Sequence, residues 1–337
     1  MIAQRSAALA PIRRLATLFG LRALSNWVLI PCILWFLAGL YLDGWAHNHG
    51  KVDNTFFTPW HAVFYSGYMA IAGMLAVIVI MSVLRGETWQ IELPSAYRQA
   101  ILAAPLFALG GVADLWWHTT FGFETGIEPL LSPPHLVLAG SMFFMSLAVA
   151  RSEVILDRWS TQIPVTLSLL AAWSVVTFIL QFNHPYGIVW PERGSLGQGN
   201  VVFGLLGIVL HSLFACVVGL WMLQRNFRRG LFTLVLVANT LLIALMGDEY
   251  RFGWVALGAG VISEAIDVLL RGRTLMVRQL ARVTSVGLTL TTLYFVVIAQ
   301  SSVLYWSLSD CMSASILTTM VCMSTVALMR ATTPATA

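Results

Sequence analysis

Residues 59–84 read PWHAVFYSGYMAIAGMLAVIVIMSVL, a run of 26 residues without a charged side chain. A helix needs about 20 apolar residues to cross the roughly 30 Å of hydrocarbon in a bilayer. Similar runs recur along the whole chain. The apolar runs cover about residues 24–43, 59–84, 100–117, 133–150, 160–182, 200–223, 231–247, 252–270, 283–300 and 309–329. The sequence therefore predicts an all-α polytopic integral membrane protein with about ten transmembrane helices.

The composition excludes an ordinary soluble domain. Of the 337 residues, 58% are hydrophobic and only 10% are charged, and the mean hydropathy is +0.80. A membrane protein can turn this much apolar surface toward lipid, whereas a soluble protein cannot bury it. The bilayer is thus the first expected partner, and nothing in the pattern predicts a nucleic-acid partner.

The positive charges predict the orientation. If the N-terminus is cytoplasmic, 16 of the 19 Lys and Arg residues fall in cytoplasmic segments, and the outer loops hold only Lys51, Arg193 and Arg251. Positive residues favour the cytoplasmic side of a membrane. We therefore expect a multi-pass protein of the cell inner (cytoplasmic) membrane with both termini in the cytoplasm.

The chain divides into four predicted segments. They are a basic interfacial N-terminal segment (1–23), a membrane module of two repeated helical hairpins (24–151), an additional six-helix membrane module (152–330) and a disordered tail (331–337).

The first module contains an internal repeat of acidic residues and histidines. Its first copy reads DGWAH at 43–47 and FTPWH at 57–61, and its second reads DLWWH at 114–118 and LSPPH at 131–135. The two aspartates are 71 residues apart, as are the histidines that follow them. Both copies fall where a predicted helix ends and the next begins, on the side expected to face outward.

This spacing is suited to metal binding. Asp43 and His47 lie on one helix face, because residues four apart are neighbours, and the hairpin returns His61 to the same depth. The second copy offers Asp114, His118 and His135 in the same way. Two imidazoles and one carboxylate suit copper, iron, zinc or manganese. The alternative is that these side chains cap helices and form hydrogen bonds in hydrated loops.

Three further polar residues lie close in sequence to these triads. His49, Asp53 and Glu124 are candidates for second-shell partners that orient the imidazoles. The alternative is that they are solvated loop residues.

The two segments resemble the C subunit of the copper-containing membrane monooxygenases, the particulate methane and ammonia monooxygenases. That subunit carries Asp-Gly-x-x-His and then Asp-x-x-Phe-Thr-Pro-x-His, to which residues 43–47 and 53–61 are similar. Its second motif, Asn-x-x-x-His-Thr-x-Phe-x-x-Glu and then Pro-x-His, is similar to residues 114–124 and 133–135. The resemblance implies copper ligands near the outer face of the membrane.

The resemblance covers about residues 24–150 and includes departures. Asp114 stands where the family has Asn, and the second loop is about three residues longer. The family's long N-terminal part has no counterpart, and about six spans follow residue 150. The resemblance implies other monooxygenase-type subunits as partners, with a homo-oligomer as the alternative.

Two classes of function follow. The first is a copper enzyme that hydroxylates a small apolar substrate with O2. The second is a copper-binding, storage or delivery protein without turnover. A zinc-dependent lipid hydrolase ranks behind both.

The second module carries one acidic group near a predicted cytoplasmic end. Glu264 and Asp267 lie close in sequence to Arg271 and Arg273, and we interpret them as an interfacial ion-pair group, with a cation path as the alternative.

Overall fold

The structure is a computed structural model that describes residues 21–51, 58–84, 95–122, 128–152, 158–194 and 197–331. Within these ranges all regular secondary structure is helical. Eight of the described helices are long and apolar enough to cross a membrane. The prediction of an all-α membrane protein is therefore confirmed, while the count of ten spans and the cytoplasmic termini remain predictions. Most of the basic N-terminal segment and nearly all of the predicted tail lie outside the described residues.

The helices of the first half of the chain cover five predicted spans. They are α3 (Leu21–Asn48), α4 (Pro59–Leu84), α5 (Ser95–Phe121), α6 (Glu128–Leu131), α7 (Pro133–Ser146), α8 (Ala148–Ser152) and α9 (Trp159–Ile179). The predicted span 133–150 is divided into α7 and α8 at Leu147. The backbone N–H of Leu147 still donates to Phe143 O at 3.0 Å, so the two pieces follow one another with little interruption.

The second half begins with two 3-10 turns and continues with five long helices. These elements are η1 (Gln181–Asn183), η2 (Trp190–Glu192), α10 (Gly197–Gln224), α11 (Leu231–Gly247), η3 (Tyr250–Phe252), α12 (Gly253–Leu269), α13 (Leu275–Ser301) and α14 (Leu308–Ala331). With 17 residues, α11 is shorter than the eight candidate spans.

The chain forms two compact units, residues 1–176 and 177–337. The predicted boundary at 151/152 lies earlier, before α9. Most of α9 belongs to the first unit because its polar groups bond there. The Ser168 hydroxyl donates to Ser146 O and accepts from Ala150 N, and the Tyr41 hydroxyl donates to Ser174 O at 2.9 Å.

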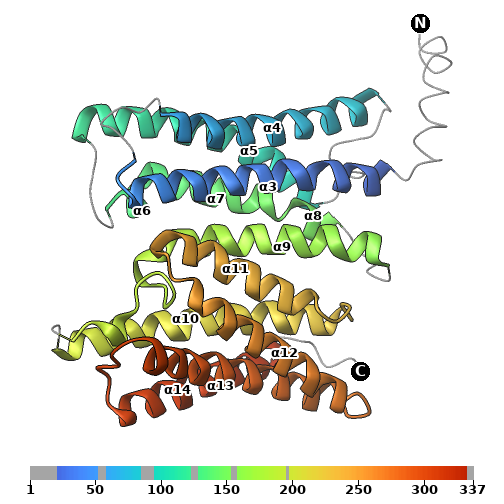
Figure 1. The fold of residues 1–337 in the computed structure, drawn as a ribbon. Helices are drawn as coiled ribbons and strands as arrows, with labels where there is room; N and C mark the ends of the chain where they lie inside the picture. Colours follow the sequence, from blue (N-terminus) through green and yellow to red (C-terminus); the bar gives the residue numbers. More distant parts are fainter. Residues whose placement is uncertain are drawn as a thin grey trace, which may run out of the picture. The chain divides into compact units, whose positions relative to one another are not determined.

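Two glycines set the packing of α3 against α4, which lie side by side in Figure 1. A Cβ at Gly39 would lie 2.6 Å from Phe64 Cα, and one at Gly67 would lie 2.6 Å from Phe36 Cα. Only glycine permits this backbone approach. It brings the end of α3, which carries Asp43 and His47, against the start of α4, which carries His61.

In the second hairpin a glycine also lies at the helix–helix contact, but its nearest neighbours are side-chain atoms and not backbone atoms. In α5, Gly110 precedes Asp114 by four residues, as Gly39 precedes Asp43 in α3. A Cβ at Gly110 would lie 3.1 Å from a Leu138 methyl group and 3.2 Å from a Val137 methyl group, both on α7. The pairing of α5 with α7 thereby places Asp114 and His118 beside His135.

Within the second unit, α13 contacts α10, α12 and α14, and α11 packs on α12. One end of this unit gathers the end of α10, the start of α11, the end of α12 and the start of α13 around a cavity.

Candidate metal centre

The first triad forms where α3 ends and α4 begins. The Oδ2 atom of Asp43 lies 3.3 Å from His61 Nε2 and 3.9 Å from His47 Nε2. The Asp43 and His61 side chains are each 15% exposed, whereas His47 is 45% exposed. One ligand is therefore open to the surroundings of the protein, and two are mostly enclosed.

The second triad has the same arrangement and is more deeply buried. The Oδ1 atom of Asp114 lies 3.4 Å from both His118 Nε2 and His135 Nδ1. The Asp114 and His118 side chains are 4% and 8% exposed, and His135 is 28% exposed.

The distances in both triads fit a metal ion. In each triad, one ligand atom from each of the three residues lies within 4.8 Å of the other two. Nitrogen and oxygen ligands bind zinc-like ions at about 2.0–2.1 Å, so two ligands of a tetrahedral ion lie about 3.4 Å apart. The separations of Asp43 from His61 and His47, 3.3 and 3.9 Å, and of Asp114 from His118, 3.4 Å, are close to this value.

The carboxylates provide an independent indication. Asp43 Oδ1 is buried and finds no hydrogen-bond partner among the described residues, and the buried Asp114 Oδ1 accepts no hydrogen bond but lies 3.4 Å from two imidazole nitrogens. A buried charged oxygen is costly unless it is paired or coordinates a metal. The donor set and the buried carboxylate oxygens together fit a divalent transition-metal ion in each triad.

The residues just before α4 and α7 help to place the second histidine of each triad. Thr58 Oγ1 accepts a hydrogen bond from the backbone N–H of His61 at 3.1 Å, as helix caps do. Ser132 occupies the matching position, but its hydroxyl lies 2.7 Å from the His135 Nδ1 atom. In the repeated Ser/Thr-Pro-x-His pattern, the hydroxyl thus holds the backbone N–H of His61 in the first hairpin and the imidazole ring of His135 in the second.

Aromatic side chains lie beside both triads. Trp45 contacts Trp60 edge to face at 6.3 Å, next to the first triad. Phe121, which follows His118 by three residues, contacts Trp117 at 4.5 Å and Trp116 at 6.0 Å. These rings place apolar surface close to the candidate metal ligands.

Tyr65, which belongs to none of the sequence motifs, contacts both hairpins. Its ring lies 6.3 Å from that of His61, and a Cβ at Gly111 would lie 3.1 Å from the Tyr65 hydroxyl. Gly111 precedes Asp114 by three residues on α5. The signal was present in the sequence, because Tyr65 follows His61 by four residues and so shares its helix face.

Of the proposed second-shell residues, only His49 is described. Its Nδ1 atom lies 2.8 Å from Trp45 O, and its ring stacks on Trp45 at 4.7 Å. Asp53 and Glu124 lie outside the described residues. The second-shell role of all three remains a prediction.

The two remaining histidines, His184 and His211, form a separate buried pair in the second unit. His184 Nε2 lies 3.0 Å from His211 Nδ1, and the backbone N–H of Tyr186 donates to His184 Nδ1 at 3.2 Å. Burial and the neighbouring imidazole hold the pKa of His184 well below its ordinary value. No carboxylate completes a metal-binding group around this pair within the part of the chain that the structure describes.

The described geometry thus yields two Asp-His-His groups within the first unit. Comparison of the chain with protein-family models, curated proteins and solved structures found no match.

Proposed function

We propose that this chain is an integral membrane protein that binds copper at its two Asp-His-His triads and hydroxylates a small apolar molecule with O2. The metal-binding part rests on one observation: each hairpin holds three ligand atoms within 4.8 Å of one another. The copper and O2 parts rest on the motifs that resemble the membrane monooxygenases.

The donor set favours copper for a chemical reason. Among divalent first-row ions, Cu²⁺ binds a given site of nitrogen and oxygen ligands most tightly, and imidazole is a common copper ligand. When bound, copper supplies one-electron chemistry toward O2. The protein's own contribution is to hold the ligands, to place Tyr65 between the hairpins and to keep the second triad enclosed.

The surroundings of the second triad suit an apolar substrate. Trp116 and Phe121 are 58% and 59% exposed at the end of a candidate transmembrane helix. In a bilayer such rings face lipid or the headgroup layer. An apolar molecule dissolved in the membrane would approach the triad along this surface.

A specific observation favours the second candidate function, copper handling without turnover. The His47 side chain is 45% exposed, so the first triad is open on the side of this ligand. An open ligand suits exchange of the ion with a carrier. Oxygen-dependent formation of product would distinguish the enzyme from this alternative.

The test of the metal sites uses the full-length protein in native lipids, with metal content measured by elemental analysis and copper by EPR. We expect His61→Ala and His135→Ala each to remove one ion, because each variant leaves a triad with two ligands, and the double variant to remove both. His49→Ala tests the predicted second-shell role of that imidazole, and it should lower the metal content of the first triad less than His61→Ala does, because no ligand is removed.

Two results would contradict the proposal. Full metal content in the correctly inserted double variant would show that the triads do not hold the ion. Zinc in place of copper would move the protein toward the hydrolase class. A Cu(II) spectrum with nitrogen couplings that disappear in the variants would support the proposal and justify screening of small alkanes, alkenes and ammonia with a reductant.

A further inference from the structure

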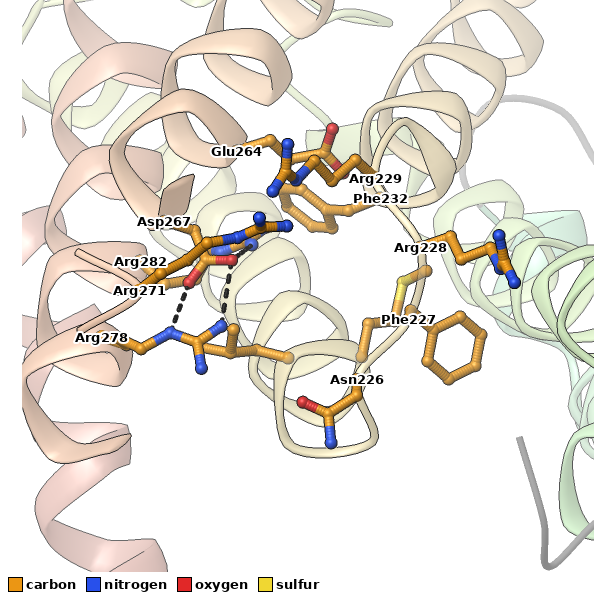
Figure 2. A pocket seen from close by; sticks show the side chains of 12 residues that line it. Asn226, Phe227, Arg228, Arg229, Phe232, Glu264, Asp267, Arg271, Arg278 and Arg282 are labelled. Atoms are coloured by element: carbon orange, nitrogen blue, oxygen red, sulfur yellow. Dashed lines mark hydrogen bonds and ion pairs between the residues drawn. The ribbon is translucent and has the colours of Figure 1, made fainter. Parts of the chain in front are cut away.

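A cavity of about 400 Å³ opens at one end of the second unit. Four helix ends meet there, and Figure 2 shows the side chains that surround the space. Five arginines line the cavity against two carboxylates, which gives its wall a net charge of +3. The charged lining residues are Arg228, Arg229, Arg271, Arg278, Arg282, Glu264 and Asp267.

Both carboxylates are already engaged by groups of the protein. Glu264 Oε2 accepts a hydrogen bond from the backbone N–H of Gly230 at 2.7 Å and one from the Thr233 hydroxyl at 3.2 Å, at the start of α11. Asp267 accepts two bonds from Arg278, at 2.8 and 3.2 Å. The sequence predicts an ion-pair group of these acids with Arg271 and Arg273, but in the structure they have other partners.

This engagement leaves positive charge without a counter-ion. Arg229 and Arg271 are exposed at the rim, and neither forms an ion pair with any residue that the structure describes. The cavity wall therefore has unused guanidinium donors. A cation would be repelled here, which argues against the cation path considered from the sequence.

Arg282 extends the positive lining into the protein. It lies seven residues into α13, which is roughly 10 Å along the helix axis from its start. Its side chain is only 6% exposed, and its closest carboxylate oxygen, Asp267 Oδ2, is 3.8 Å away. The Nε atom is buried and has no hydrogen-bond partner among the described residues. The Phe232 ring, 5.0 Å from the guanidinium carbon, holds the group in place.

A buried guanidinium donor without an acceptor is costly, and an anion that entered the cavity would supply acceptors. Guanidinium groups match phosphate oxygens in geometry and can bind them in pairs. We propose that this cavity binds a phosphate-bearing anion, with Arg229 and Arg271 at its mouth and Arg282 at its base.

Three of the helices around the cavity are candidate membrane spans, so their ends lie at headgroup depth. The shared ligand chemistry is a phosphate group, whether it belongs to an anionic lipid or to a soluble molecule.

The test measures binding to the purified full-length protein in phosphatidylcholine nanodiscs. Phosphatidylglycerol, inorganic phosphate and glycerol phosphate are titrated separately, and binding is followed by thermal stabilisation and native mass spectrometry. The variant is Arg229→Gln with Arg271→Gln, which changes two exposed residues without described ion pairs and so leaves the fold intact. Arg273→Gln is the matched control, because Arg273 is exposed in the same loop but does not line the cavity.

We expect the double variant to bind the effective probe at least about tenfold more weakly, since charge-assisted hydrogen bonds are lost. The control should remain within about twofold of the original affinity, because surface charges are screened. Binding of phosphatidylglycerol alone identifies a lipid headgroup, and binding of inorganic phosphate or glycerol phosphate identifies a soluble anion. Either result supports the site.

Three outcomes would overturn the proposal: equal affinity of the double variant and the original protein, an equal loss in Arg273→Gln, or no binding of any phosphate probe. The metal content of the double variant should not change, because the triads lie in the other unit. A failure of this site is thus distinguishable from a failure of the metal sites.

Discussion

At the scale of single residues, the two aspartates of the repeat differ in how deeply their carboxylates are buried. Asp114 is almost fully buried, while Asp43 keeps 15% of its side chain exposed. Each has one buried oxygen that accepts no hydrogen bond among the described residues, although Asp114 Oδ1 has two imidazole nitrogens 3.4 Å away. A buried carboxylate in this state destabilises the metal-free protein and is stabilised when a cation binds. The deeper site should therefore couple metal binding to stability more strongly.

The substitution Asp114→Asn tests this coupling. The amide has nearly the same shape but no charge, so the metal-free variant should be as stable as the original protein or more stable in a thermal melt. Its metal affinity at this site should fall at least about tenfold, because an anionic ligand is lost. Asp43→Asn is the comparison, and we expect its metal-free melting temperature to change less. A metal-free Asp114→Asn protein that melts well below the original would show that the carboxylate is structural.

At the scale of helices, the first triad depends on the register of one hairpin. The close contacts of Gly39 with Phe64 and of Gly67 with Phe36 involve backbone atoms on both sides. Backbone cannot move aside as a flexible side chain can. The position of His61 opposite Asp43 is thus set by contacts that begin four to six residues away from the ligands.

We expect Gly67→Ala to force α3 and α4 apart and to cost about 1–3 kcal/mol of stability, as overpacking of a tight contact does. The same shift should lower metal occupancy of the first triad and leave the second unchanged. Gly73→Ala lies on the same helix and meets nothing within 4 Å. This control should be neutral or more stable by up to about 1 kcal/mol, because alanine favours helix. Thermal melts and metal analysis of both variants test this prediction. Equal melting temperatures and equal metal content in Gly67→Ala and Gly73→Ala would contradict the role of helix register.

At the scale of the whole molecule, the orientation in the membrane remains a prediction from charge. The chain offers a convenient probe, because Lys51 is its only lysine. It is exposed and follows α3 by three residues, close to the first triad.

A membrane-impermeant amine reagent should label Lys51 in intact cells, or in spheroplasts where an outer membrane is present, because the positive-inside pattern places this loop outside. Lys51→Arg keeps the charge and should lose the label. Labelling that requires disruption of the inner membrane would place the triads on the cytoplasmic side and reverse the predicted topology.

The sequence by itself determined the features that depend on local periodicity. Long apolar runs must form helices in a bilayer, since unpaired backbone groups are costly there. The Asp-x3-His spacing places two ligands on one helix face, and this is a property of the helix repeat alone. This spacing names Asp43, His47, Asp114 and His118, and the repeated Ser/Thr-Pro-x-His pattern names His61 and His135. The glycine that precedes each Asp by four residues was also visible in the repeat, but its role was not.

Only the tertiary structure decided which groups meet across helices. It brought His61 and His135 to their aspartates, placed Tyr65 between the hairpins and gave Glu264 and Asp267 partners other than those expected. The physical reason is that contacts between helices depend on register and side-chain volume along the whole interface, which spacing within one segment does not encode. The arginine cavity arises in the same way, because its lining comes from two helix connections, residues 222–232 and 264–282, that meet only in the folded chain.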